Sequence, residues 1–147
     1  ARAWQAGIAK VIEPWAQGGT PTVVVHTVPH FNAFDARLCP TFRILANIDH
    51  CGLQLARSQA DANRQAAVQA EVAAVAGVSL ARTLDLADDI CTRATCSTNR
   101  GRTWLYKDGA HLTVPFALTL AHRFRSAIGA ALDRQQAQSQ PSRPGTE

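Results

Sequence analysis

Apolar residues recur at helical spacing in long stretches of the chain that are separated by glycine, proline or polar residues. In residues 2–17 the apolar side chains fall on one side of a helix, whose last turn Pro14 is expected to distort before Gly18 and Gly19 end it. Residues 54–76 form the longest helical pattern, rich in alanine, glutamine and arginine, and Gly77 supplies a stop. The residues of these two helices expected to face the core are Trp4, Ile8, Val11, Ile12, Trp15, Leu55, Ala62, Ala66, Val72 and Val75.

Two other stretches have the pattern of buried strands. Residues 21–28, PTVVVHTV, form a nearly uninterrupted β-branched run, which is typical of a strand covered on both faces by helices. Residues 78–86 predict a second strand, which ends at an acidic turn where Asp85 is expected to be structural and Asp88 and Asp89 to be solvated or to cap a helix. Helices that alternate with buried strands indicate an α/β domain with a parallel sheet.

The last third of the chain predicts a short strand, a turn and a final helix. The strand covers residues 103–106, and Thr113 and Pro115 suit the N-cap and first turn of the helix. Residues 136–147 are polar and contain two prolines, so we predict a domain over residues 1–135 and a disordered tail over 136–147. The expected core stripe of the final helix is Ala117, Leu120, Ala121, Phe124 and Ile128, whereas His122, Arg123 and Arg125 are expected to face solvent.

Length and charge narrow the class of protein. The 147 residues make one domain, and the start at Ala1 with no methionine suggests a processed product or a piece of a longer protein. The apolar runs are too short to span a bilayer. The net charge of +4 comes from scattered arginines rather than from a basic stripe, which argues against a nucleic-acid surface, and no pattern specifies an oligomeric state.

The four cysteines bracket two short segments. Cys39 and Cys51 enclose one loop, and Cys91 and Cys96 enclose a second, very short one. Neither pair has the C-x-x-C spacing of a zinc knuckle, although His50 beside Cys51 leaves a zinc site as a weaker alternative. Two local disulfides fit the spacing of the cysteines better than a zinc site does, and disulfides indicate a domain outside the cytosol. We expect no metal or other cofactor.

The stretch WLYKDGAHLT, residues 104–113, carries the clearest candidate chemistry. Asp108 and His111 lie three residues apart on a turn between the short strand and the final helix. A carboxylate that fixes the tautomer of an imidazole and stabilises its cation prepares the imidazole to act as a general base. The plainer alternative is a helix-capping turn with an exposed histidine.

Polar side chains near the end of the first strand are the second set of candidates. Loops that leave the carboxyl ends of parallel strands line the binding crevice of open α/β folds, and His26, Thr27 and His30 lie near such a rim. Thr27 and His30 are the candidate substrate-binding residues. His26 is more simply explained as a packed residue and His30 as a solvated one.

Together these segments resemble the SGNH hydrolase superfamily, and in particular the SGNH domain fused to bacterial membrane O-acyltransferases of the acyltransferase-three type. The residues that carry the resemblance are Thr27, Val28, Pro29, Cys91, Cys96, Tyr106, Asp108, His111, Leu112 and Thr113. The resemblance implies a three-layer α/β/α, flavodoxin-like fold with a parallel sheet, of which this chain holds the C-terminal two-thirds. It also implies that His111 is the base and Asp108 the supporting acid of a Ser-His-Asp triad, in a periplasmic or exported domain.

The family's nucleophile block, Gly-Asp-Ser, is absent from this sequence. Ser58 and Ser126 fall in predicted helices, and neither Ser79 nor Ser97 sits on a strand-to-helix elbow. The resemblance therefore implies an incomplete domain that supplies Asp108 and His111 to O-acetyl transfer onto a cell-surface glycan, with the acyl group delivered by a membrane acyltransferase domain. The alternatives are a secreted SGNH acetylesterase and a non-catalytic remnant.

Overall fold

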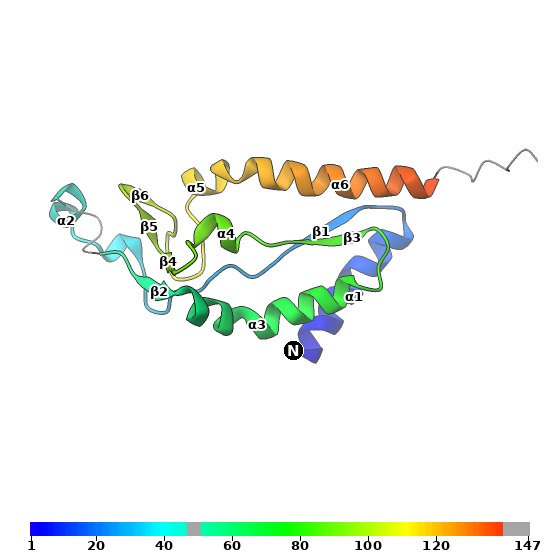
Figure 1. Ribbon diagram of the computed structural model, residues 1–147, viewed down its shortest axis with the longest axis horizontal. Helices are drawn as coiled ribbons and strands as arrows, with labels where there is room; N and C mark the ends of the chain where they lie inside the picture. Colours follow the sequence, from blue (N-terminus) through cyan, green and yellow to red (C-terminus); the bar gives the residue numbers. More distant parts are fainter. Residues whose placement is uncertain (47–50, 140–147) are drawn as a thin grey trace, which may run out of the picture.

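A computed structural model describes residues 1–46 and 51–139 and shows three layers. Two parallel strands, β1 (Thr22–Val25) and β3 (Ala81–Leu84), form the middle layer, with Thr22 opposite Ala81 and Val25 opposite Leu84. Helices α1 (Arg2–Gln17) and α3 (Arg57–Val75) lie on one side of this sheet, and α6 (Ala121–Ser139) lies on the other (Figure 1). The predicted α/β/α class with a parallel sheet is confirmed.

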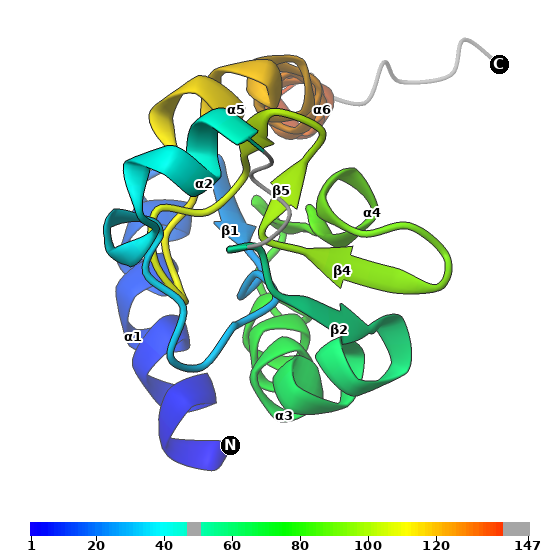
Figure 2. The same cartoon turned by 90° about the vertical axis from the view of Figure 1, so that its left-hand side faces the viewer.

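Shorter elements gather at the carboxyl ends of β1 and β3. Strand β2 pairs with β4 and β5 pairs with β6, both antiparallel, and Figure 2 shows β2, β4 and β5 at this end of the molecule. The elements of this region are η1 (Ala36–Leu38), α2 (Thr41–Ala46), β2 (Gln54–Ala56), α4 (Ala87–Ile90), β4 (Thr95–Ser97), β5 (Asn99–Arg100), β6 (Thr103–Trp104) and α5 (Val114–Thr119).

The core has two parts. The larger cluster lies at the end that carries the short elements and contains Phe31, Leu86, Leu105 and Tyr106, with Phe116 and Leu120 from the last helical segment. The smaller cluster joins α1, α3 and the sheet through Ile12, Val75 and Ala81. Both disulfides form as predicted, Cys39–Cys51 and Cys91–Cys96, and the second belongs to the larger cluster.

The longest predicted helix begins later than its sequence pattern suggests. Residues 54–56 pair with residues 95–97 as β2 and β4, because an antiparallel partner brought close by the fold overrides their helix-favouring composition. The structure also contains α2 inside the loop that Cys39 and Cys51 enclose.

The predicted core stripe of the last helix is wrong in part. Helical structure is interrupted at Leu120, so α5 and α6 present different faces to the core. Ala117 and Ile128 are exposed, and Phe116, Ala127 and Ala131 are buried together with Leu120. Arg123 is not simply solvent-facing, because it forms an ion pair with Asp89.

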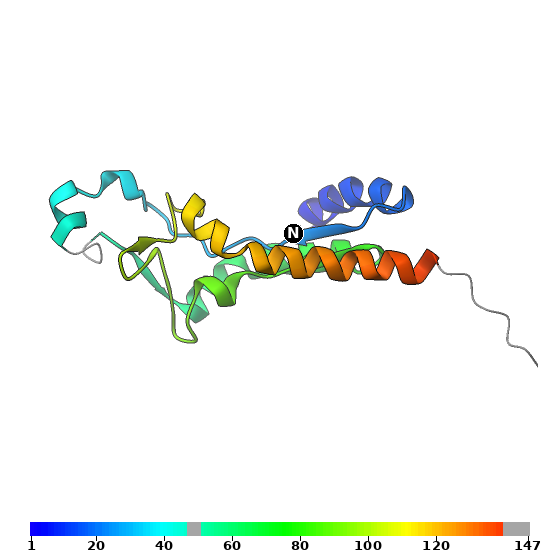
Figure 3. The same ribbon diagram turned by 90° about the horizontal axis from the view of Figure 1, so that it is seen from above.

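Helix α6 continues through residues 136–139, beyond the predicted start of the tail, and residues 140–147 lie outside the described residues. Viewed from above, α6 runs over most of the length of the sheet (Figure 3). Across the described ranges, no helix combines the length and apolar content that a membrane span requires.

Candidate functional site

A two-stranded ladder closes the turn that carries Asp108 and His111. Tyr106 bridges Leu112, the Lys107 amide donates to the His111 carbonyl at 2.8 Å, and the Thr113 amide donates to the Leu105 carbonyl at 2.8 Å. Thr113 then begins α5 as its N-cap, as predicted, since its hydroxyl oxygen accepts from the Phe116 amide. The turn is thus held between an extended arm and a helix rather than within a free loop.

Asp108 and His111 face each other across this turn. Nδ1 of His111 lies 2.8 Å from Oδ1 of Asp108, and the same oxygen accepts from the amides of Ala110 and His111 at 3.0 Å each. The Ala110 amide, followed by the His111 side chain, lowers the pKa of Asp108 to about 2, so the carboxylate is ionised at neutral pH. The contact engages Nδ1 and leaves Nε2 as the nitrogen available to a reactant.

The pair differs strongly in exposure. The His111 side chain is 74% exposed, whereas that of Asp108 is 26% exposed. An imidazole at the surface, backed by a carboxylate that the backbone holds in place, can exchange protons with a bound molecule. The same contacts also suit a capping turn, because Asp108 accepts from two backbone amides.

The segment that follows β1 supports the turn from the other side. The Phe31 amide donates to the Gly109 carbonyl at 2.7 Å, and the Ala36 amide donates to the Lys107 carbonyl at 3.0 Å. A Cβ atom on Gly109 would lie 2.1 Å from the Phe31 carbonyl oxygen, so only glycine permits this approach. In Figure 2 the two segments run side by side, the first in blue and the second in yellow.

Tyr106, in the extended stretch before the turn, binds the segment that follows β1. It is fully buried, its hydroxyl donates to the Pro29 carbonyl at 2.7 Å, and its ring packs edge-on against Phe31 with 4.9 Å between ring centroids. Burial raises the pKa of Tyr106, which keeps the phenol protonated and able to donate. The contacts of Tyr106 with Pro29 and Phe31 hold the Asp108–His111 turn in position over the core.

The structure separates the two candidate substrate-binding residues. His30 is exposed beside the turn, with its Cε1 atom 3.7 Å from the position that a Cβ on Gly109 would take. Thr27 instead donates its hydroxyl to Oε1 of Glu71 at 2.9 Å and lines a hollow with Ala1, Trp4, Ala66 and Ala67. His30 stays a candidate at the site, whereas the Thr27 hydroxyl is committed to a contact within the fold.

Glu71 is the residue that sequence reasoning missed. Its buried carboxylate accepts from the Trp4 indole at 3.3 Å and from the Thr27 amide at 3.3 Å, and lies 2.8 Å from Nδ1 of His26. His26 is buried, in agreement with the prediction that it is a packed residue. A lone glutamate next to core-facing alanines of a helix is the only signal that the sequence offers for this role.

Asp85 has the structural role predicted for it. Both of its oxygens accept from the guanidinium of Arg64, at 2.9 and 2.7 Å, and Oδ1 also accepts from the Ala87 amide. Burial alone would raise the pKa of Asp85, but the hydrogen bonds from Arg64 and Ala87 outweigh it and the pKa falls below the usual value. Arg64 also donates to the Thr27 carbonyl, so the pair joins the ends of β1 and β3.

The described residues place no serine hydroxyl in a hydrogen bond with His111. Ser58 and Ser126 lie in α3 and α6, and the Ser97 hydroxyl contacts Asn99. Within the part of the chain that the structure describes, His111 therefore has its supporting carboxylate but no nucleophile beside it.

The zinc alternative is wrong for the cysteines. All four are joined in disulfides, and His50 lies outside the described residues. In the described ranges no three histidine, cysteine or acidic side chains come together as a metal site.

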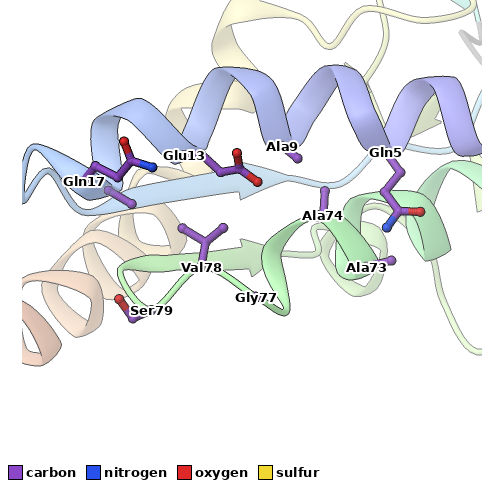
Figure 4. A pocket seen from close by; sticks show the side chains of 10 residues that line it. Gln5, Ala9, Glu13, Gln17, Ala73, Ala74, Gly77, Val78 and Ser79 are labelled. Atoms are coloured by element: carbon purple, nitrogen blue, oxygen red, sulfur yellow. The ribbon is translucent and has the colours of Figure 1, made fainter.

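An open groove between two helices lies away from the dyad. It has a volume of about 500 Å³, runs between α1 and α3 and is lined by Gln5, Glu13, Ala74 and Val78 among others (Figure 4). None of the predicted site residues lines it. The groove therefore gives no support to a role in the chemistry of the Asp108–His111 turn.

Comparison with known families agrees with the resemblance seen in the sequence. The family model described as "SGNH domain (fused to AT3 domains)" matches residues 1–126, a span that includes the whole Asp108–His111 turn. No curated protein and no solved structure matches the chain.

Proposed function

The chain belongs to the family of SGNH domains fused to AT3 domains, and we propose that its His111 is the base of an acyl-transfer site and its Asp108 the carboxylate that supports that base. Membership indicates an acyltransferase-associated, SGNH hydrolase-like role. The observation that carries the finer assignment is the 2.8 Å contact between Nδ1 of His111 and an Asp108 carboxylate that the backbone also holds. We further propose that the natural reaction is O-acetyl transfer to a cell-surface glycan.

In this proposal His111 accepts and returns one proton in each of two half-reactions. Nε2 takes the proton of a serine hydroxyl as its oxygen attacks the carbonyl carbon of the acyl donor, and then returns that proton to the oxygen that leaves. A second hydroxyl, from a glycan or from water, repeats the sequence on the acyl-serine and regenerates the serine. Asp108 stays ionised throughout and stabilises the imidazolium that forms between the steps.

The serine is supplied from outside the described residues, since none of these brings a hydroxyl to His111. The acyl donor is delivered from the membrane acyltransferase domain to which such domains are fused, and His30, exposed beside the turn, is placed to contact the acceptor. Two disulfides fit a non-cytoplasmic location, and we assign the domain to the periplasmic or extracellular face of the membrane.

Replacement of His111 in the full-length protein tests the proposal. We expect His111→Ala to lower the hydrolysis of a chromogenic acetate ester by roughly 10³-fold or more, with no change in the cooperative unfolding transition, because the removed side chain is mostly exposed. His122→Ala is the matched control, because His122 is also exposed and its Nδ1 lies 3.0 Å from the carbonyl oxygen of Thr119.

Unchanged turnover in His111→Ala would eliminate the triad assignment. It would favour the non-catalytic alternative, in which Asp108 serves only as the cap of the turn. Hydrolysis without transfer to any sugar acceptor would favour the acetylesterase alternative.

A further inference from the structure

One half-buried arginine differs from the others because it has no acidic partner. Three arginines that are buried or half-buried each form an ion pair with an aspartate, and these pairs are Arg57–Asp61, Arg64–Asp85 and Arg123–Asp89. Arg82 in β3 is half-buried too, but no ion pair or hydrogen bond joins its side chain to another described residue, and its Nη1 atom is buried without a partner. A charge taken out of water costs free energy unless an opposite charge or hydrogen bonds compensate it.

Arg82 lines a hollow at the outer edge of the sheet. The hollow has a volume of about 440 Å³ and is lined by residues of α3 and α6, which cover opposite faces of the sheet, and of β3, but by none of β1. It therefore lies at the edge of β3 away from β1. Arg134 of α6 lines it as well, with the hydroxyl-bearing residues Ser79 and Thr83, and none of the described residues in its wall is acidic.

Both arginines approach the hollow from the α6 side. Leu84 of β3 and Ala127 of α6 belong to the larger core cluster, whereas Ala81 belongs to the smaller cluster on the other face of the sheet. Successive side chains of a strand point to opposite faces, so Arg82 shares the face of Leu84. Figure 1 shows α6 along this face, and Arg134 reaches the same hollow from that helix.

The wall on the α3 side is apolar. Val72, Val75 and Ala76 line the hollow from the end of α3, and Val78 lines it from the turn that follows. Val72 is 48% exposed, so part of this apolar surface is open to a ligand. The carbon atoms of a sugar ring present a C–H face that can cover such a surface.

The two guanidinium groups determine the charge of a suitable ligand. A guanidinium group carries its N–H donors in a planar fork, which matches two oxygens of a carboxylate or a phosphate. Arg82 and Arg134 repel each other across the hollow, and an anion between them replaces this repulsion with attraction. The anion would also supply the opposite charge that Arg82 lacks within the described part of the chain.

We propose that this hollow binds a carboxylate or phosphate group borne by a sugar, with the oxyanion between Arg82 and Arg134 and the sugar ring against Val72. The hydroxyl groups of Ser79 and Thr83 are available as further donors to the oxyanion. This inference does not rest on the proposed function. Arg82 lies near the amino end of β3, whereas the Asp108–His111 turn lies beyond the carboxyl ends of the strands.

Calorimetric titration of the full-length protein at constant ionic strength tests the proposal. Glucuronate is the probe, glucose is its neutral control, and inorganic phosphate shows whether an oxyanion is sufficient without a sugar. We expect saturable binding of glucuronate, weaker binding of phosphate and no binding of glucose at the same concentrations. Phosphate that binds as tightly as glucuronate would support the oxyanion site but overturn the sugar as the carrier.

Glutamine variants assign the binding to the hollow. We expect Arg82→Gln to weaken glucuronate binding by roughly 10-fold or more and Arg134→Gln by roughly 3-fold or more, because each removes charge-assisted hydrogen bonds to the carboxylate. Arg125→Gln is the matched control, because it removes the same charge from an exposed position of α6 outside the hollow, and it should change binding by less than about 1.5-fold. Arg134 is exposed, so its variant keeps the test decisive should Arg82→Gln fail to fold.

Three results would each overturn the proposal: no saturable binding of glucuronate or phosphate, equal binding of glucose, or unchanged glucuronate binding in a folded Arg82→Gln or Arg134→Gln variant. Arg82 would then serve only to keep the edge of β3 from pairing with another strand. Hydrolysis of an acetate ester is not part of the titration, so the proposal and the proposed function can fail separately.

Discussion

One short turn depends on a different interaction at each of three positions, Asp108, Gly109 and His111. Asp108 needs the amides of Ala110 and His111 to hold its carboxylate, and His111 needs that carboxylate at Nδ1. Gly109 needs to lack a side chain, because the carbonyl oxygen of Phe31 occupies the place of a Cβ atom. The Asp-x-x-His spacing was visible in the sequence, but the requirement at Gly109 was not, since it depends on a segment almost eighty residues earlier.

Gly109→Ala should therefore damage the site through its backbone. The added methyl group must displace the Phe31 carbonyl and weaken the hydrogen bond from the Phe31 amide, which we expect to cost about 2 kcal/mol in the free energy of unfolding. Gly129→Ala, in the middle of α6 with open space around its Cβ position, should raise stability by up to about 1 kcal/mol. Urea denaturation of both variants checks the opposite signs, and equal effects would contradict the close approach at Gly109.

At the scale of elements, the local sequence pattern predicted a feature correctly where residues close in the sequence determine it. The boundaries of α1, the cap at Thr113 and the pairing of both disulfides followed from neighbouring residues. Local pattern failed where a distant partner decides the conformation. Residues 54–56 have a helix-favouring composition but pair with residues 95–97, and the interruption at Leu120 changes which side of the last helix is buried.

The two disulfides should differ in their effect on stability. Loop entropy alone favours Cys39–Cys51, at ~3 kcal/mol for a separation of 12 against ~2 kcal/mol for the separation of 5 in Cys91–Cys96. Burial favours the opposite order, because Cys91 and Cys96 lie in the larger core cluster whereas the other pair borders α2, whose residues are all exposed.

We expect burial to determine which disulfide contributes more to the free energy of unfolding. The double serine variant of Cys91 and Cys96 should lose about 3–5 kcal/mol, and that of Cys39 and Cys51 no more than ~3 kcal/mol, in urea denaturation. The reverse order would show that the segment around α2 is a stronger part of the folding unit than its exposure suggests.

At the scale of the whole molecule, Glu71 joins parts of the chain that the sequence gives no reason to associate. Its carboxylate connects α1 through Trp4 and the end of β1 through His26 and Thr27, all from a position in α3. The α/β class could be predicted because it depends on the order and periodicity of helices and strands. The partners of a buried carboxylate could not, because they are set by how these elements pack in three dimensions.

Glu71→Gln keeps the size of the side chain but replaces one acceptor oxygen with a donor that faces other donors. We expect a loss of about 2–4 kcal/mol in the free energy of unfolding, because buried donors from Trp4, His26 or Thr27 are left without an acceptor. Glu13→Gln, at an exposed position of α1 in the open groove, should change stability by less than about 0.5 kcal/mol. Similar values for the two variants would mean that the contacts of Glu71 contribute nothing to stability.

The most direct test of the account is the turnover of Asp108→Asn in the full-length protein, measured with an acetate ester. Asp133→Asn, at an exposed position of α6, is the control. Asparagine can still accept from the Ala110 and His111 amides, so the turn should persist, but it cannot stabilise an imidazolium by charge. The account predicts that hydrolysis falls by about 10²–10⁴-fold in Asp108→Asn, with a cooperative unfolding transition retained, and stays at the wild-type rate in Asp133→Asn. Wild-type turnover in Asp108→Asn would contradict it, and Asp108 would then be only the cap of a turn.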